Sequence, residues 1–147
     1  MKRSERLKVI ETLAKQREDQ AAAALGQIRA QVEAEEGRYK ELESYRAEYL
    51  GYLDGQGGQG ISIEQWRRTQ GFIDQLGDLM VRQQNAVAQW KEREDQVLQK
   101  WQALYQKRKN IAKFIEGISI EEVIAADKQE QQAIDELVSM RYGQEGP

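Results

Sequence analysis

The chain has 147 residues, of which 32% are charged and 39% are hydrophobic, and it contains neither cysteine nor histidine. The lack of these two residue types removes disulfides, thiolate nucleophiles and the commonest general base and metal ligands. The net charge of −3 comes from 25 acidic and 22 basic residues spread along the whole chain, a pattern typical of solvated helices. Composition therefore argues against most enzyme classes and against nucleic acid as the main partner, and we expect no cofactor and no metal.

The first half of the chain, about residues 4–53, is predicted to form one long helix. Its apolar side chains recur three and four positions apart, which is the spacing of a coiled-coil seam. An extra step of four between Ala21 and Leu25 predicts local unwinding of the supercoil near residues 21–24. The predicted seam positions are Leu7, Ile10, Ala14, Ala21, Leu25, Ile28, Val32, Glu35, Tyr39, Leu42, Arg46, Tyr49 and Leu53.

A glycine-rich turn is predicted at residues 54–61, because four glycines fall within residues 54–60. It resembles no phosphate-binding loop, since no Gly-Lys-Ser/Thr follows it. Ser62 and Gln65 have the spacing of a capping box, so the second helix is expected to begin at about Ser62 and to extend to about residue 116.

The second helix carries a longer seam with the same spacing of three and four. The chain's single proline is Pro147, so no proline interrupts it. A repeat this long indicates supercoiling around a partner helix. The predicted positions are Trp66, Thr69, Ile73, Leu76, Met80, Gln83, Val87, Trp90, Glu94, Val97, Trp101, Leu104, Arg108, Ile111, Ile115 and Ile118.

The short turn makes the two helices partners of each other. They are expected to pair antiparallel, with Tyr49 near Trp66 and Leu42 near Ile73. The predicted fold class is therefore all-α: a long antiparallel two-helix coiled coil, or helical hairpin, with a short C-terminal helix, in a single domain. No stretch approaches the roughly 18 apolar residues of a membrane span and no signal peptide is recognisable, so we expect a cytoplasmic protein.

The C-terminal helix is predicted from an echo of the first turn. The segment that begins at Gly117 repeats the pattern that begins at Gly60, with Ser119 and Glu122 as a second capping box. A break near Gly117 and a separate helix over about residues 119–141 are therefore expected.

Two kinds of exposed residue are candidate functional sites. Acidic pairs such as Glu33 with Glu36 and Glu121 with Glu122 are interpreted as solvated helix surface, because no histidine accompanies them. Large apolar side chains beside the predicted seam are more informative, and they form two stripes near the turn. These stripes are either a docking site for another protein or a surface covered by the C-terminal helix, and spacing leaves both interpretations open. The stripes are Leu42, Tyr45 and Tyr49 on the first helix, and Phe72, Leu76 and Leu79 on the second.

The sequence also resembles a known family over essentially its whole length. The resembling features are the glycine-rich turn followed by Gly60-Ile61, Trp66, Gln70, Phe72-Ile73, Leu76, Gln89-Trp90 and Trp101. They are similar to the FliJ family, coiled-coil components of the bacterial flagellar type III export apparatus. The rival interpretation is a generic cytoplasmic coiled-coil scaffold or holdase chaperone.

The resemblance implies a stalk-like, non-enzymatic role at the flagellar base, in the cytoplasm and peripheral to the inner membrane. Its implied partners are the export ATPase FliI, the ATPase regulator FliH, the export-gate protein FlhA and the export chaperones FlgN and FliT. The family's gate-contacting surface corresponds here to Leu42, Tyr45, Tyr49, Phe72 and Leu76. Three further positions depart from the family's pattern: Arg38 replaces a glutamine, Leu79 an alanine and Gln83 a histidine.

Overall fold

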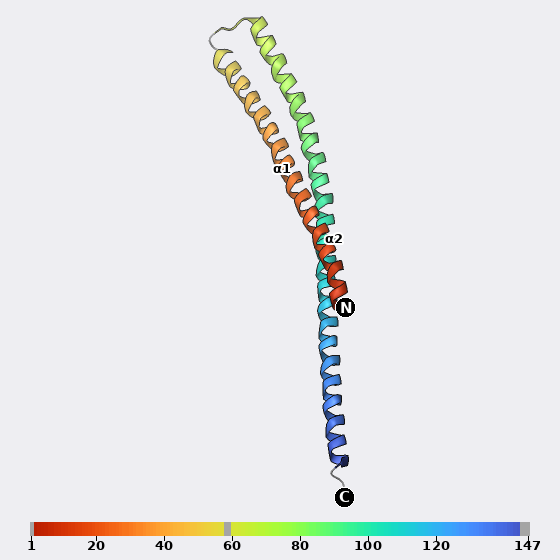
Figure 1. Ribbon diagram of the computed structural model, residues 1–147. Coiled ribbons are helices and arrows are strands. Elements are labelled where there is room, and N and C mark those ends of the chain that lie inside the picture. Colours follow the sequence, from red (N-terminus) through yellow and green to blue (C-terminus); the bar gives the residue numbers. More distant parts are fainter. Residues whose placement is uncertain (1, 58–59, 145–147) are drawn as a thin grey trace. The chain divides into compact units, whose positions relative to one another are not determined.

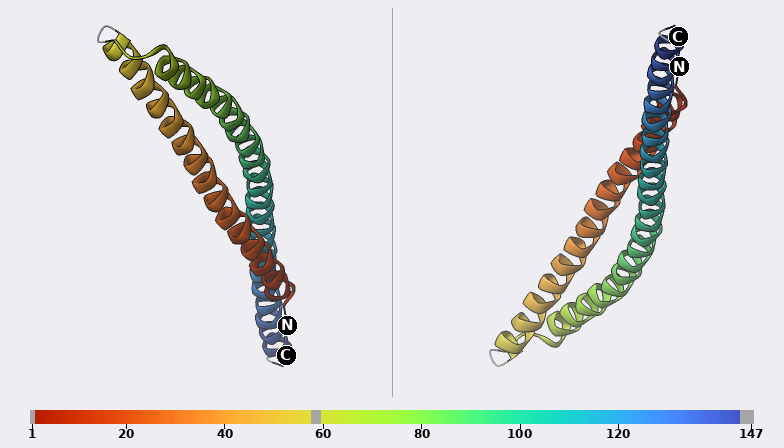
Figure 2. Two further views of the ribbon diagram at one scale, coloured as in Figure 1. Left: turned by 90° about the horizontal axis from the view of Figure 1, so that it is seen from above. Right: turned by 90° about the horizontal axis from the view of Figure 1, so that it is seen from below.

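A computed structural model describes residues 2–57 and 60–144. It contains two helices, α1 over Arg3–Gly57 and α2 over Ile63–Gln144, and no strand within these described ranges. Figures 1 and 2 show that the chain reverses between the two helices, so that α2 returns alongside α1 in the opposite direction. The all-α helical hairpin predicted from the sequence is confirmed.

The contacts between the helices fall into two compact units. Unit 1 comprises Met1–Asp19 and Gln102–Pro147, and unit 2 comprises Gln20–Trp101. Each unit thus contains a piece of α1 packed against a piece of α2.

The start of α2 follows the predicted capping box. The backbone N of Gln65 donates to Ser62 Oγ at 3.1 Å, and the backbone N of Ser62 donates to Gln65 Oε1 at 3.4 Å. Gly60 has a φ of 80°, a backbone conformation that favours glycine. The capping prediction is confirmed, and α2 begins at Ile63, one residue after the cap.

The turn is shorter than the predicted residues 54–61. Helix α1 continues through Gly57, so residues 54–57 are helical. A glycine in a helix costs only about 1 kcal/mol relative to alanine, and buried Leu53 anchors the last turns against α2. The predicted turn residues Gly58 and Gln59 lie outside the described residues.

The predicted seam of α2 agrees with the observed burial from Thr69 to Ile118. Ile73, Leu76, Ile115 and Ile118 are buried, and every predicted position between Leu76 and Ile115 is half-buried. Trp66 is the exception, because its side chain remains 46% exposed. The apolar spacing alone was therefore sufficient to find the contact face of this helix.

The seam of α1 differs from its prediction near the N-terminus. Ile10 is 50% exposed, whereas Ser4 and Glu18 are buried. With Glu18 in the seam, the buried residues from Ala14 to Leu25 are spaced four, three and four positions apart. This is a regular coiled-coil spacing, so the extra step predicted near residues 21–24 is absent. The predicted seam was therefore wrong at Ile10 and missed the buried polar positions Ser4 and Glu18.

The predicted break near Gly117 is absent, since α2 runs without interruption to Gln144. Ile115 and Ile118, on either side of the glycine, are 4% and 8% exposed. Burying such side chains contributes about 1.5–3 kcal/mol each, more than the roughly 1 kcal/mol that a helical glycine costs. The separate helix over residues 119–141 is thus the last part of α2.

The second predicted capping box is also wrong, because Glu122 contacts the other helix. Ser4 donates to Glu122 from its backbone N at 3.2 Å and from its Oγ at 2.7 Å. A free amide at the start of α1 is thereby satisfied by a carboxylate from α2. The bonds from Ser4, together with nearby Lys2, hold the pKa of the Glu122 carboxyl below its ordinary value.

This contact predicts a pH-dependent contribution to stability. A carboxyl with a lower pKa in the folded state adds stability above its unfolded pKa and loses it as the pH falls through the folded pKa. We expect Glu122→Gln to lower the urea midpoint at neutral pH and to reduce the fall of that midpoint between neutral pH and about pH 3. Urea titrations followed by circular dichroism test this, with the exposed neighbour Glu121→Gln as the matched control. Parallel pH curves for wild type and Glu122→Gln would contradict it.

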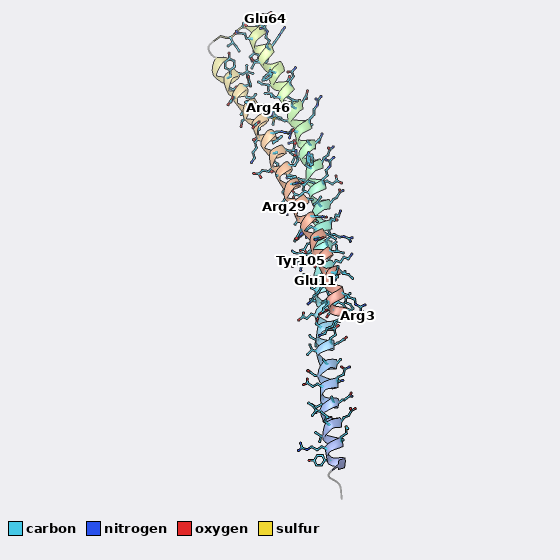
Figure 3. The ribbon with its side chains drawn as sticks, in the orientation of Figure 1. Arg3, Glu11, Arg29, Arg46, Glu64 and Tyr105 are labelled. Atoms are coloured by element: carbon cyan, nitrogen blue, oxygen red, sulfur yellow. The ribbon has the colours of Figure 1, made fainter. Side chains whose placement is uncertain are left out.

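Beyond Glu122, α2 has no facing helix within the described chain. Figure 3 shows Arg3 at the start of α1, with α2 continuing past it. Every residue in 123–143 is exposed. Within unit 1, this segment of α2 therefore has no packing partner among the described residues.

Candidate functional site

The candidate site lies within unit 2, on the two apolar stripes near the turn. We call Leu42, Tyr45, Tyr49, Phe72, Leu76 and Leu79 the docking surface, after the role that the sequence predicts for them. Its most exposed side chains are Tyr45 at 51%, Phe72 at 42% and Leu79 at 44%. They are exposed because they lie beside the seam and not in it.

A ring contact joins the two stripes. The centroids of Tyr49 and Phe72 lie 4.8 Å apart, with the ring planes at 70° in an edge-to-face arrangement. Such pairs contribute about 0.5–1.5 kcal/mol beyond the area that they bury. The sequence had placed Tyr49 near Trp66, so the observed partner lies six residues further along α2.

Two residues of the docking surface are largely covered by the neighbouring helix. Leu76 is 5% exposed and Leu42 is half-buried, so both pack between the helices. Their side chains hold the two stripes together. The surface that another protein can reach is consequently formed by Tyr45, Tyr49, Phe72 and Leu79.

Arg38 and Gln83 converge on a buried carboxylate, that of Glu35. Gln83 Nε2 donates to the Glu35 backbone O at 2.9 Å and also to Glu35 Oε2. Arg38 Nη1 donates to Glu35 Oε1 at 2.9 Å, and Gln31 Nε2 donates to the same oxygen at 3.0 Å. Two of the three positions that the sequence analysis expected to depart from the family's pattern therefore belong to one polar junction that ties α1 to α2.

Tyr52 also belongs to this face, although the predicted stripes do not include it. It follows Tyr45 and Tyr49 at spacings of four and three, and its side chain is 47% exposed. The same spacing rule would have found it, had the stripe been followed one step towards the turn.

The acidic pairs prove to have partners in the hairpin. Glu36 forms an ion pair with Lys91 at 3.0 Å across the helices, and Glu122 accepts the bonds from Ser4 described above. Their companions Glu33 and Glu121 are exposed. One carboxylate of each pair thus connects α1 to α2, where the sequence predicted only solvated surface.

In the part of the chain that the structure describes, neither α1 nor α2 contains a segment long and apolar enough to cross a bilayer.

The fold and the site together define a helical-hairpin coiled-coil protein with an exposed aromatic face. The family model described as "Flagellar FliJ protein" matches residues 2–147. The chain therefore belongs to the FliJ family of flagellar export proteins.

Curated relatives agree with this assignment. The chain is 26% identical over 131 residues to the flagellar FliJ protein of Salmonella typhi, which covers 89% of each chain. It is also 26% identical over 131 residues to the flagellar FliJ protein of Escherichia coli (strain K12), again with 89% of each chain covered. No solved structure gives a significant match.

Proposed function

We propose that this protein is a non-enzymatic, stalk-like component of flagellar type III export that binds the export-gate protein FlhA through the docking surface. It acts in the cytoplasm, peripheral to the inner membrane at the flagellar base. Its further partners are the export ATPase FliI, the regulator FliH and the chaperones FlgN and FliT. It hydrolyses nothing itself and acts by binding.

The observation that carries this proposal is the exposed aromatic face of unit 2. Tyr45, Tyr49 and Phe72 are large apolar side chains at 38–51% exposure, next to one another on two paired helices. Exposed clusters of this kind are typical of protein interfaces, and aromatic anchors dominate the binding energy of such interfaces. The resemblance to the FliJ family supports FlhA as the partner, because it implies that this face corresponds to the gate-contacting surface of the family.

The Glu35 junction supports a rigid surface. Its hydrogen bonds come from both helices, so the spacing between the stripes is fixed before a partner arrives. Binding to a preformed surface loses less side-chain and backbone entropy than binding to a flexible one. A rigid stalk can then shift its partner between states by the difference in its affinity for those states.

The proposal is tested by measuring binding to the cytoplasmic domain of FlhA from the same organism. We expect a Tyr45→Ala, Phe72→Ala double variant to bind about tenfold or more weakly than wild type, because two interface anchors are lost. Both residues lie outside the seam, so circular dichroism is expected to report unchanged helicity.

The matched control is Leu50→Ala, Val81→Ala, which removes two exposed apolar side chains of unit 2 that lie off the stripes. This control is expected to bind like wild type. If both double variants weaken binding equally, the generic scaffold interpretation is favoured, since it requires no fixed site. If wild type does not bind at all, the proposed gate contact is wrong.

A further inference from the structure

Unit 1 contains a second surface that the proposed gate contact does not use. Ile10 and Leu13 are 50% and 51% exposed, because the seam of α1 runs beside them through Ser4, Ala14 and Glu18. Together with α2 they form an open groove of about 170 Å³. Its lining residues are Ile10, Leu13, Ala14 and Arg17 from α1, and Leu104, Lys107 and Ile111 from α2.

The apolar floor of this groove continues along α2. A neighbouring hollow shares Lys107 and Ile111 with the groove and adds Phe114, which is 54% exposed. Arg3 lies over the Phe114 ring, with its guanidinium carbon 5.8 Å from the ring centroid. The strip is therefore several helical turns long: the groove lies between α1 and α2, and its continuation lies along α2.

The charged residues that line the strip are all cationic. Arg17 and Lys107 are part of the lining, which contains no acidic residue. On α1, Arg3 and Arg6 continue the face of Ile10, Leu13 and Arg17 at spacings of three and four. Within the part of the chain that the structure describes, neither Arg17 nor Lys107 has a carboxylate within 4.0 Å.

We propose that this groove binds an amphipathic helix of another protein, with apolar side chains on one face and acidic side chains flanking them. A groove between two helices accepts a third helix through anchors spaced three and four residues apart. The cationic rim then selects acidic flanks, because like charges across an interface are repelled. An anionic membrane surface would also attract these cations, but a flat bilayer does not reach the floor of a concave groove.

Two synthetic helical peptides test the proposal. Both carry leucines at coiled-coil spacing, and they differ only in having glutamate or lysine on the flanks. We expect the full-length protein to bind the glutamate peptide, measured by fluorescence anisotropy, about tenfold or more tightly than the lysine peptide. Added salt is expected to weaken that binding.

Variants locate the site. Leu13→Asp and an Arg17→Glu, Lys107→Glu double variant are each expected to lose binding of the glutamate peptide. Val81→Asp, a similarly exposed apolar residue in unit 2, is expected to retain it. All four substituted residues are exposed to solvent, and circular dichroism verifies that each variant is folded.

The outcomes are distinct from those of the gate-binding test, which uses residues of unit 2. Equal affinity for the two peptides, or no loss in the groove variants, overturns the proposal. So does binding to vesicles of anionic lipid in the absence of binding to the glutamate peptide, which would make the cationic strip a membrane contact. Loss confined to the groove variants supports it, whatever the result with FlhA.

Discussion

An Ile73→Ala variant is expected to lose about 3 kcal/mol of unfolding free energy, within the range of about 2–5 kcal/mol for removing a large buried aliphatic side chain. Ile73 is 2% exposed, the lowest value among the buried apolar residues. A two-helix seam has little other material with which to refill the cavity, so relaxation recovers only part of the loss.

Urea denaturation followed by circular dichroism measures this effect. The matched control is Val81→Ala, which shortens an aliphatic side chain that is 57% exposed on the same helix. We expect the control to stay within about 0.5 kcal/mol of wild type. If Ile73→Ala lost as little unfolding free energy as the control, Ile73 would not be a core residue in solution.

The second large effect is expected at the ion pair within the unit 1 seam. Arg108 Nε and Nη2 donate to the two carboxylate oxygens of Glu18. Glu18 is buried, with 4% of its surface exposed. The hydrogen bond that Arg108 donates to Glu18 raises the pKa of the Arg108 guanidinium above its ordinary value, so Arg108 stays charged. Either Glu18→Leu or Arg108→Leu is therefore expected to lower the urea midpoint, because each leaves a charge in the seam without its partner.

The double variant gives the sharper result. Replacing a buried ion pair by two apolar side chains is often neutral or stabilising, since neither charge then has to be desolvated. We expect Glu18→Leu, Arg108→Leu to recover at least the wild-type midpoint, so that the two single effects are strongly non-additive. The exposed pair Glu64 and Arg68, at 3.9 Å, is the control, and its leucine variants are expected to change little. A double variant as unstable as either single one would show that the charges specify the pairing of the helices.

The sequence predicted the exposed apolar residues of the candidate site but not its polar junction at Glu35, and the two differ in physical origin. Tyr45 and Phe72 were found because exposed positions beside a regular seam can be counted along a helix. The tie between Arg38 and Gln83 through Glu35 could not be found in this way, because Glu35 and Gln83 lie 48 residues apart in the chain. Which helix turns face each other must be known before such a bond can be expected.

The sequence by itself determined the helical class, the reversal of the chain, the cap at Ser62 and the contact face of α2. These features depend on local quantities: the absence of internal proline, the glycines of the turn, and apolar residues at fixed spacing. Only the tertiary structure decided the seam of α1 near its start and the continuation of α2 through Gly117. There, polar residues such as Glu18 are buried by partners about 90 residues away, and burial against the facing helix outweighs a local preference worth about 1 kcal/mol.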